Sequence, residues 1–147
     1  MTITEFQGEH RFLSNFWYVT VIYDYEIYPS VEHAYQAAKT LDMEDRDYIR
    51  HLPKPGDAKR AGKNIVLRED WDQVKLLVMK NLVWQKFQYP GLKSKLLATG
   101  DRALIEGNRW HDNFWGVCSC GVCQNTKHII GHNYLGRVLM DVRSKLR

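Results

Sequence analysis

Three side chains on one predicted helix could carry out proton transfer and nucleophilic chemistry. Glu32, Gln36 and Lys39 are four and three residues apart. At about 100° per residue, this spacing puts a carboxylate, an amide and an amine on one helical face. The alanines between them would let the helix approach a ligand or the protein core closely. The alternative interpretation is a solvent-exposed face, because Glu-to-Lys stripes are common on the surfaces of helices.

A second group of chemistry-bearing side chains lies in an irregular segment that follows Gly107. Trp110 and Trp115 frame a histidine, Asp112 and an asparagine. Aromatic faces can stack on a nucleobase while carboxylate and amide groups contact its polar edge. The alternative is that the aromatic side chains only anchor the loop to the core.

All three cysteines lie close together, at Cys118, Cys120 and Cys123. A tetrahedral zinc site would need a fourth ligand, which His128 or His132 could supply. Only the last two cysteines have the C-x-x-C spacing of common structural zinc sites, so reduced free thiols are the other interpretation. We therefore assign no metal ligands and no cofactor from the sequence.

The elements that must position these groups fit one domain over residues 1–147. The chain has a mass of 17.3 kDa, with 44% hydrophobic and 26% charged residues. This composition is that of a soluble globular protein. No apolar run approaches the about 20 residues that cross a bilayer, and no secretory signal precedes the domain. The sequence thus predicts an intracellular, cytoplasmic protein without a membrane segment, and it leaves the oligomeric state open.

The charge balance is mildly basic. The chain has 21 Lys and Arg residues against 17 Asp and Glu, which gives a net charge of +4 and a pI near 9.0. The spacings of a P-loop and of a dinucleotide fingerprint do not occur. Any phosphate recognition must therefore come from side chains or helix N-termini, and the candidates are Lys59, Arg60, Lys63 and Arg137.

Local patterns predict a mostly helical chain with a few strands. Ser30 and Asp42 are expected helix N-caps, and Asp70 with Gln73 has the spacing of a capping box. The expected elements are a hairpin within 11–27, helices over 31–41 and 42–51, a loop at 53–56, a short helix from 57 to 62, a long helix over 70–87, a helix over 90–98, a strand at 103–106 and a last helix around 135–142.

Several segments, taken in order, resemble the NADAR family of YbiA-like N-glycosidases. The resemblance runs from about residue 11 to residue 146. It implies an α+β fold, mostly helical with a small sheet. The matching segments are Phe12 to Phe16, Glu32-His33 with Gln36-Ala37 and Lys39, Arg60 with Gly62, Trp71 with Val74-Lys75 and Met79, Lys86-Phe87, Trp115-Gly116, and Asn133 to Gly136 followed by Leu139-Met140 and Arg143.

The resemblance implies an enzyme that breaks an N-glycosidic bond without a cofactor. Family activities include the cleavage of phosphoribosylamino pyrimidine intermediates of riboflavin synthesis and the removal of ADP-ribose from guanine. In both substrates ribose C1 is bonded to an exocyclic amino nitrogen. We expect ADP-ribosylated guanine, in a nucleotide or nucleic acid, to be the substrate. The alternatives are the phosphoribosylamino pyrimidine and a non-catalytic module that binds ADP-ribose or NAD.

The resemblance also implies roles for single residues. Glu32 matches the important glutamate of the family and is expected to transfer the proton. Lys39 is expected to attack the opened sugar as a Schiff-base nucleophile, or else to pair with Glu32 or bind a phosphate. Several relatives carry Asp after the Trp-Gly pair, where this chain has Val117, so Asp112 is expected to replace it. The expected substrate-binding residues are Ser14, Asn15, Gln36, Arg60, Trp71, Trp110, Trp115 and Asn133.

Overall fold

The computed structural model describes residues 1–147, and in it the chain forms two compact units. Unit 1 contains Met1–Ser14 together with Pro90–Arg147, and unit 2 contains Asn15–Tyr89. The expected single domain over residues 1–147 therefore stays a prediction. None of the helices is both long enough and apolar enough to span a membrane.

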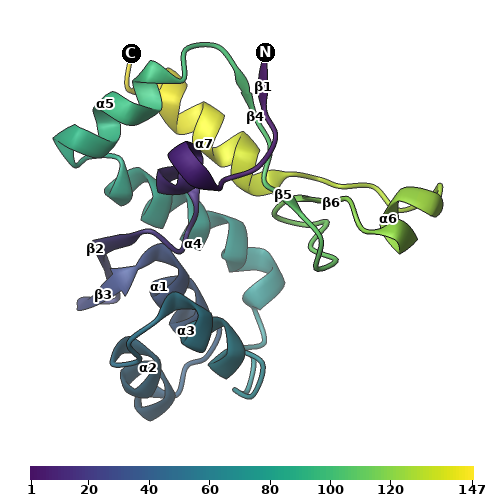
Figure 1. Cartoon of the computed structure of the whole chain (residues 1–147). Coiled ribbons are helices and arrows are strands. Elements are labelled where there is room, and N and C mark those ends of the chain that lie inside the picture. The colour runs from purple at the N-terminus through teal and green to yellow at the C-terminus, as the bar shows by residue number, and fades with distance from the viewer. The chain divides into compact units, whose positions relative to one another are not determined.

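Unit 2 is a hairpin followed by four helices, and its central element is helix α1. This helix contacts both hairpin strands and the three other helices, and all its residues are buried. Figure 1 shows α1 beneath the hairpin, with α2 and α3 beside it. The elements are β2 (Tyr18–Tyr23), β3 (Glu26–Ser30), α1 (Val31–Ala38), α2 (Met43–Arg50), α3 (Pro55–Ala61) and α4 (Trp71–Lys86).

Local chemistry explains where the elements of unit 2 begin. The hydroxyl oxygen of Ser30 accepts the backbone N–H of His33 at 3.1 Å, which confirms Ser30 as the N-cap of α1. The carboxylate of Asp42 caps α2 in the same way. The hairpin turns through Asp24 and Tyr25, whose φ angles of 49° and 69° are those of a two-residue turn that matches the twist of the strands.

Three local predictions were wrong in detail. The predicted hairpin began at Arg11, but Gly8–Leu13 forms a 3-10 helix, η1. Pro55 lies in the first turn of α3 rather than in a loop, because its missing N–H has no intrahelical partner there. Asp70 makes no capping bond, since its carboxylate instead accepts two N–H groups of Arg68, at 2.6 and 3.0 Å.

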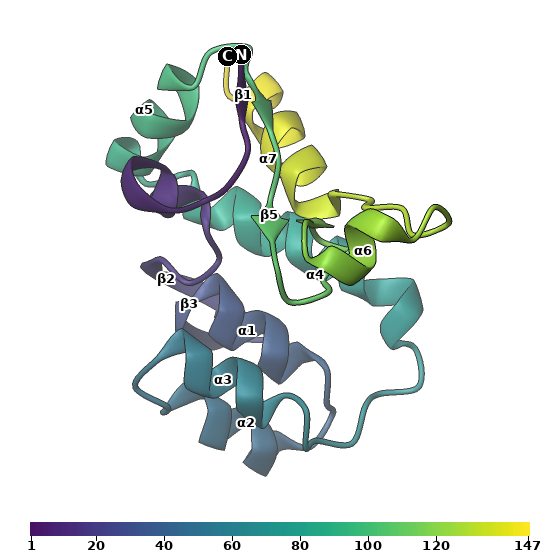
Figure 2. The same cartoon turned by 45° about the vertical axis from the view of Figure 1, so that its right-hand side comes forward.

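Unit 1 combines the N-terminal segment Met1–Ser14 with the C-terminal part of the chain, Pro90–Arg147. Two short parallel strand pairs, β1 with β4 and β5 with β6, lie beside helix α7 in Figures 1 and 2. The core is formed by Leu13, Leu96, Leu104 and Leu139, which are fully or almost fully buried. The elements are β1 (Thr2–Ile3), η1, α5 (Pro90–Ala98), β4 (Ala103–Leu104), β5 (Gly107–Asn108), β6 (Val117–Cys118), α6 (Gly121–Asn125) and α7 (Tyr134–Lys145).

Helices with small separate sheets make this an α+β protein, as predicted. The predicted helices after Ser30, Asp42, Asp70 and Pro90 are all present. The predicted strand at 103–106 is shortened to Ala103–Leu104, because its partner β1 has only two residues.

Candidate active site

The polar face of α1 lies inside unit 2 rather than in solvent. Glu32 is 7% exposed and Gln36 is 4% exposed, while Lys39 at the C-cap is half-buried. A buried carboxylate or amide is costly unless the protein or a ligand provides hydrogen bonds. The burial therefore argues against the interpretation of this stripe as a solvent-exposed helix surface.

Glu32 and Gln36 form a hydrogen-bonded pair. The side-chain Nε2 of Gln36 donates to Oε1 of Glu32 at 3.0 Å, and this bond orients the carboxylate along the helix. The other amide atom, Oε1 of Gln36, is buried and has no hydrogen-bond partner in the structure. Buried acceptors without partners are rare in folded proteins and call for an explanation, of which a ligand donor is one.

Gly62, just after α3, lets the backbone approach this pair closely. A Cβ atom built at position 62 would collide with the side-chain oxygen and carbon of Gln36. Gly62 has an ordinary negative φ of −61°, so the requirement for glycine comes from space rather than from backbone conformation. This explains in physical terms why Gly62 accompanies Gln36 in the sequence pattern.

The amine of Lys39 lies in a partly buried, electropositive environment. Burial lowers the pKa of Lys39 from its ordinary value, and the positive charges of Lys59, Lys63 and Lys75 lower it further. The carboxylate of Glu32 raises it and so opposes these effects. The lowered pKa increases the fraction of free amine, which is the nucleophilic form.

Aromatic rings border the same helix. The ring centroids of Tyr35 and Trp71 are 5.2 Å apart, and the Lys39 ammonium lies 5.4 Å from the centroid of the Tyr35 ring. Trp71 is 5% exposed at the start of α4. This burial suits a floor for the site better than an open stacking platform.

Two other predicted binding residues of unit 2 have contacts within the protein. The backbone oxygen of Asn15 accepts the N–H of Glu32 at 3.1 Å, and its side chain reaches the sulfur of Met79 at 3.5 Å. Asn15 therefore holds the first turn of α1. The exposed guanidinium of Arg60 forms an ion pair with Asp57.

The remaining predicted site residues lie in unit 1, mostly in the loop from Gly107 to Asn133. Oδ1 of Asp112 accepts the backbone N–H groups of Phe114 and Trp115, at 3.1 and 2.9 Å. Trp110 is half exposed, whereas the Trp115 ring packs edge-on against Phe114 with centroids 4.8 Å apart. The Asp112 carboxylate thus shapes the loop, and its catalytic role stays a prediction.

Asn133 and Ser14 have backbone-anchoring positions in unit 1. The amide of Asn133 accepts the N–H of Glu106 at 2.9 Å and donates to the oxygen of Leu104 at 2.9 Å. Asn133 itself has φ 54°, a left-handed conformation in which asparagine is tolerated. Ser14 is the C-cap of η1. Substrate contact by these two side chains stays a prediction.

Four possible metal-ligating groups gather in the same loop, and the histidine among them differs from the predicted one. The sulfur atoms of Cys118, Cys120 and Cys123 lie with a ring nitrogen of His111, all within 4.8 Å of one another. Neither His128 nor His132 belongs to the group. The structure therefore places neither candidate histidine beside the sulfurs, because the loop folds back toward a histidine that precedes the cysteines.

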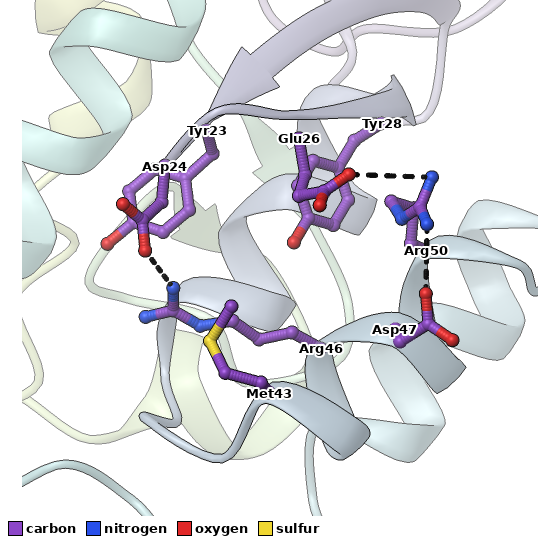
Figure 3. A pocket seen from close by; sticks show the side chains of 8 residues that line it. All are labelled: Tyr23, Asp24, Glu26, Tyr28, Met43, Arg46, Asp47 and Arg50. Carbon is purple, nitrogen blue, oxygen red and sulfur yellow. Dashed lines mark hydrogen bonds and ion pairs between the residues drawn. The ribbon is translucent and has the colours of Figure 1, made fainter.

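A small pocket between the hairpin and α2 has a different character (Figure 3). Arg46 donates to the carboxylate of Asp24 at 2.7 Å and to the backbone oxygen of Thr40 at 2.8 Å. Arg50 pairs with Glu26 and Asp47. Because its charged groups are paired with one another, this pocket is better explained as an ion-pair network that fastens α2 to the hairpin.

The sequence indicated no role for three further residues of unit 2. Tyr35 and Lys75 contribute to the surroundings of Lys39. Tyr35 could have been found from its spacing of three and four residues from Glu32 and Lys39. Lys86 in α4 is buried, and burial lowers its pKa to about 7. Its position seven residues after Met79, on the apolar face of the helix, is the signal for its burial.

Comparisons with known proteins agree with the α+β fold. The NADAR domain model matches residues 4–147. The N-glycosidase YbiA of Escherichia coli is 35% identical over 136 residues, which cover 90% of this chain and 79% of that protein. The NMR structure of Escherichia coli YbiA matches with a TM-score of 0.81 and 32% identity, over 99% of this chain and 83% of that chain.

A plant relative carries the same region within a longer protein. The chloroplastic riboflavin biosynthesis protein PYRR of Zea mays is 35% identical over 136 residues. The match covers 84% of this chain but only 20% of the maize protein.

The fold and the relatives together define an enzyme of the N-glycosidase class. The chain belongs to the NADAR family. This confirms both the family and the YbiA-like fold expected from the sequence.

Proposed function

We propose that the chain hydrolyses the bond between C1 of a phosphorylated ribose and an exocyclic amino nitrogen of a base. The observation that carries this proposal is the buried group on α1, where Glu32, Gln36 and Lys39 share one face. In such a reaction a carboxylate can transfer the proton, the oxygen of Gln36 without a partner can accept a ligand donor, and an amine of lowered pKa can act as a nucleophile.

Glu32 is the proposed proton-transfer residue. The C–N bond to be broken belongs to an aminal. Breaking this bond needs a proton on the leaving nitrogen or on the ring oxygen. The bond from Gln36 holds the carboxylate of Glu32 in one orientation. Water then supplies the hydroxyl group of the released ribose, and the base regains its amino group.

Lys39 has two proposed roles that differ in chemistry. In the covalent version, the free amine attacks C1 of the ring-opened sugar, the base leaves as an amine, and water hydrolyses the resulting Schiff base. In the electrostatic version, the ammonium binds a phosphate of the substrate. The lowered pKa of Lys39 supports the first version, and the nearby Lys59 and Lys63 support the second.

The basic side chains around Lys39 fit a substrate with phosphate next to the reacting ribose. Lys59, Lys63 and Lys75 all act electrostatically on Lys39, so their charges converge on one region of unit 2. Lysine ammonium groups bind phosphates as flexible point charges. Both ADP-ribose and phosphoribose carry phosphate at the 5-position of that ribose.

We place ADP-ribosylated guanine first among the substrates. Two features favour this order: Val117, at the position where the family resemblance gives Asp in several members, and the cysteine-rich segment after it. The phosphoribosylamino pyrimidine is the second candidate, favoured by the name of the maize relative, a riboflavin biosynthesis protein. A binding module without turnover is the third, and a buried Glu32 argues against it.

Product analysis by mass spectrometry tests the proposal. Purified protein is incubated with ADP-ribosylated guanosine DNA, with the phosphoribosylamino pyrimidine, or with buffer. Release of ADP-ribose and restored guanine supports the first substrate, and release of ribose 5-phosphate moves the enzyme to the second. Binding of either compound without any product would contradict the proposed activity.

Borohydride trapping separates the two roles of Lys39. Reduction during turnover converts a Schiff base into a stable amine that adds the sugar mass to the protein. The covalent version predicts this adduct in the wild type and its loss in Lys39→Arg, with Lys80→Arg, an exposed site on α4, as the matched control. An active enzyme that shows no adduct contradicts the covalent version and leaves the electrostatic one.

A further inference from the structure

The four-residue group in the loop of unit 1 has the composition and spacing of a closed zinc site. Nδ1 of His111 lies 3.4 Å from the sulfur of Cys120 and 3.5 Å from the sulfur of Cys123. In a tetrahedral zinc site, Zn–S and Zn–N bonds of about 2.3 and 2.0 Å put such nitrogen and sulfur atoms about 3.6 Å apart. The observed separations therefore suit one shared ion.

The backbone arrangement around the sulfurs supports the same interpretation. Backbone N–H groups of His111 and Cys120 point to the sulfur of Cys118 at 3.3 and 3.4 Å, and the N–H of Cys123 points to the sulfur of Cys120 at 3.5 Å. The side-chain amide of Asn113 donates to the sulfur of Cys123 at 3.4 Å. Backbone and amide N–H groups directed at sulfur are the outer-shell contacts typical of metal-bound cysteines.

The conformation of His111 is a further, independent feature. Its φ of 66° lies in the left-handed region, which non-glycine residues adopt uncommonly and at a cost of about 1 kcal/mol or more. This conformation turns both the backbone N–H and the ring of His111 toward the cysteines. Four ligands on one ion would offset the local strain.

A disulfide explains these positions less well. Pairing any two of the three cysteines leaves the third thiol, the histidine nitrogen and the sulfur-directed donors without a role. Free thiols likewise leave unexplained why a histidine seven residues before Cys118 joins the group. A zinc ion with three thiolates and one neutral imidazole uses all four groups.

We propose that His111, Cys118, Cys120 and Cys123 bind one Zn²⁺ ion that fixes the loop from Trp110 to Cys123. The site joins strand β6, the N-terminus of α6 and the turn at His111. All four positions are taken by the protein, so the ion is structural and takes no part in the proposed hydrolysis. The backbone N–H of Cys118 donates to Oδ1 of Asn113, which links the ion to the turn that contains Asp112.

Metal analysis of the wild-type protein is the first test. The protein is produced in zinc-supplemented medium, passed through a desalting column and analysed by mass spectrometry for metals. We expect about one zinc per chain and, after exchange, the strong visible absorption of Co²⁺ bound to thiolates in a tetrahedral site. Zinc far below one equivalent, with three thiols that react rapidly before and after zinc addition, overturns the proposal.

Single substitutions identify the ligands. His111→Ala should weaken zinc binding by more than the about 10–100-fold that is typical of losing an outer-shell partner, and Asn113→Ala should fall within that range. His128→Ala, an exposed histidine outside the group, is the matched control and should bind zinc as the wild type does. If His128→Ala or His132→Ala loses zinc and His111→Ala keeps it, the assigned ligand set is wrong.

The zinc proposal and the proposed hydrolase activity can fail separately. Zinc content and the Co²⁺ spectrum are measured without substrate, whereas the mass-spectrometric assay reports only on turnover. Should His111→Ala fail to fold, the Co²⁺ spectrum of the wild type still decides whether thiolates bind the ion. A spectrum with weak octahedral bands and no sulfur charge transfer contradicts the site.

Discussion

The two polar regions of the molecule differ in how completely the hydrogen bonds of their side chains are satisfied. On α1 of unit 2, Gln36 leaves a buried oxygen without a partner and Lys39 has a lowered pKa. In the loop of unit 1, Asp112 and Asn133 direct their side chains to backbone groups that shape the chain. The first pattern is that of a site prepared for a ligand, and the second is that of a scaffold.

The largest expected effect comes from Glu32→Gln. Removing a positioned acid or base lowers the rate by about 10²–10⁴-fold, so kcat/KM should fall within that range. The amide keeps the size of the side chain, and the free energy of unfolding should change by less than about 1 kcal/mol. Glu44→Gln, exposed on α2, is the matched control in the same assay. If the Glu32→Gln enzyme stays active, Glu32 is not the proton-transfer residue and the polar face of α1 has a structural role.

A smaller but still large effect is expected for Gly62→Ala. The added methyl group must displace Gln36, which overpacks the region and should cost about 1–3 kcal/mol of stability. The displacement also breaks the bond to Glu32, so kcat should fall. Gly91→Ala meets open space near the start of α5 and serves as the control. Urea unfolding measures both variants, and equal stabilities would show that Gln36 moves aside freely.

The comparison becomes sharper with two substitutions at Asp112. Asp112→Asn keeps an oxygen that can accept the N–H groups of Phe114 and Trp115, so activity should stay within a few-fold of the wild type. Asp112→Ala loses both bonds and should cost about 1–3 kcal/mol of stability. If kcat of Asp112→Asn instead falls as far as that of Glu32→Gln, Asp112 is catalytic and the loop is more than a scaffold.

The smallest expected effect concerns His33, a buried group of α1 with satisfied hydrogen bonds. Its ring nitrogens lie 2.7 Å from the Ser30 hydroxyl and 2.8 Å from the Leu52 oxygen, and burial lowers its pKa below the ordinary 6.5. The folded state therefore disfavours the charged ring. Its contribution to stability is complete above about pH 6.5 and falls by at most about 1.4 kcal/mol per pH unit as the pH drops from 6.5 toward the lower folded pKa.

Urea unfolding at pH 7.5 and 5.5 checks this expectation. His33→Gln should show a smaller loss of stability between the two pH values than the wild type. His128→Gln, at an exposed position in unit 1, is the control. An identical pH dependence in the wild type and in His33→Gln would mean that His33 has the same pKa in the folded and unfolded states.

Local sequence predicted most of the helices because their signals are local. Ser30 and Asp42 cap helices in the structure as predicted, since an N-cap needs only a short polar side chain and the next turn of backbone. One error arose where a neighbouring side chain competed for the same group. Arg68 takes the carboxylate of Asp70 away from its predicted capping bond, and no rule of helix spacing contains that contact.

The spacing of Glu32, Gln36 and Lys39 by itself determined their shared face, because helical periodicity depends only on the backbone. The family and the α+β class followed from the resemblance of several ordered segments to that family. Whether that face lies in solvent or in the protein was decided by the elements that cover α1, which come from other parts of unit 2. The tertiary structure likewise places His111, rather than His128 or His132, beside the cysteines. Proximity across a folded loop depends on where the chain turns, and the spacing of residues along the chain does not contain that information.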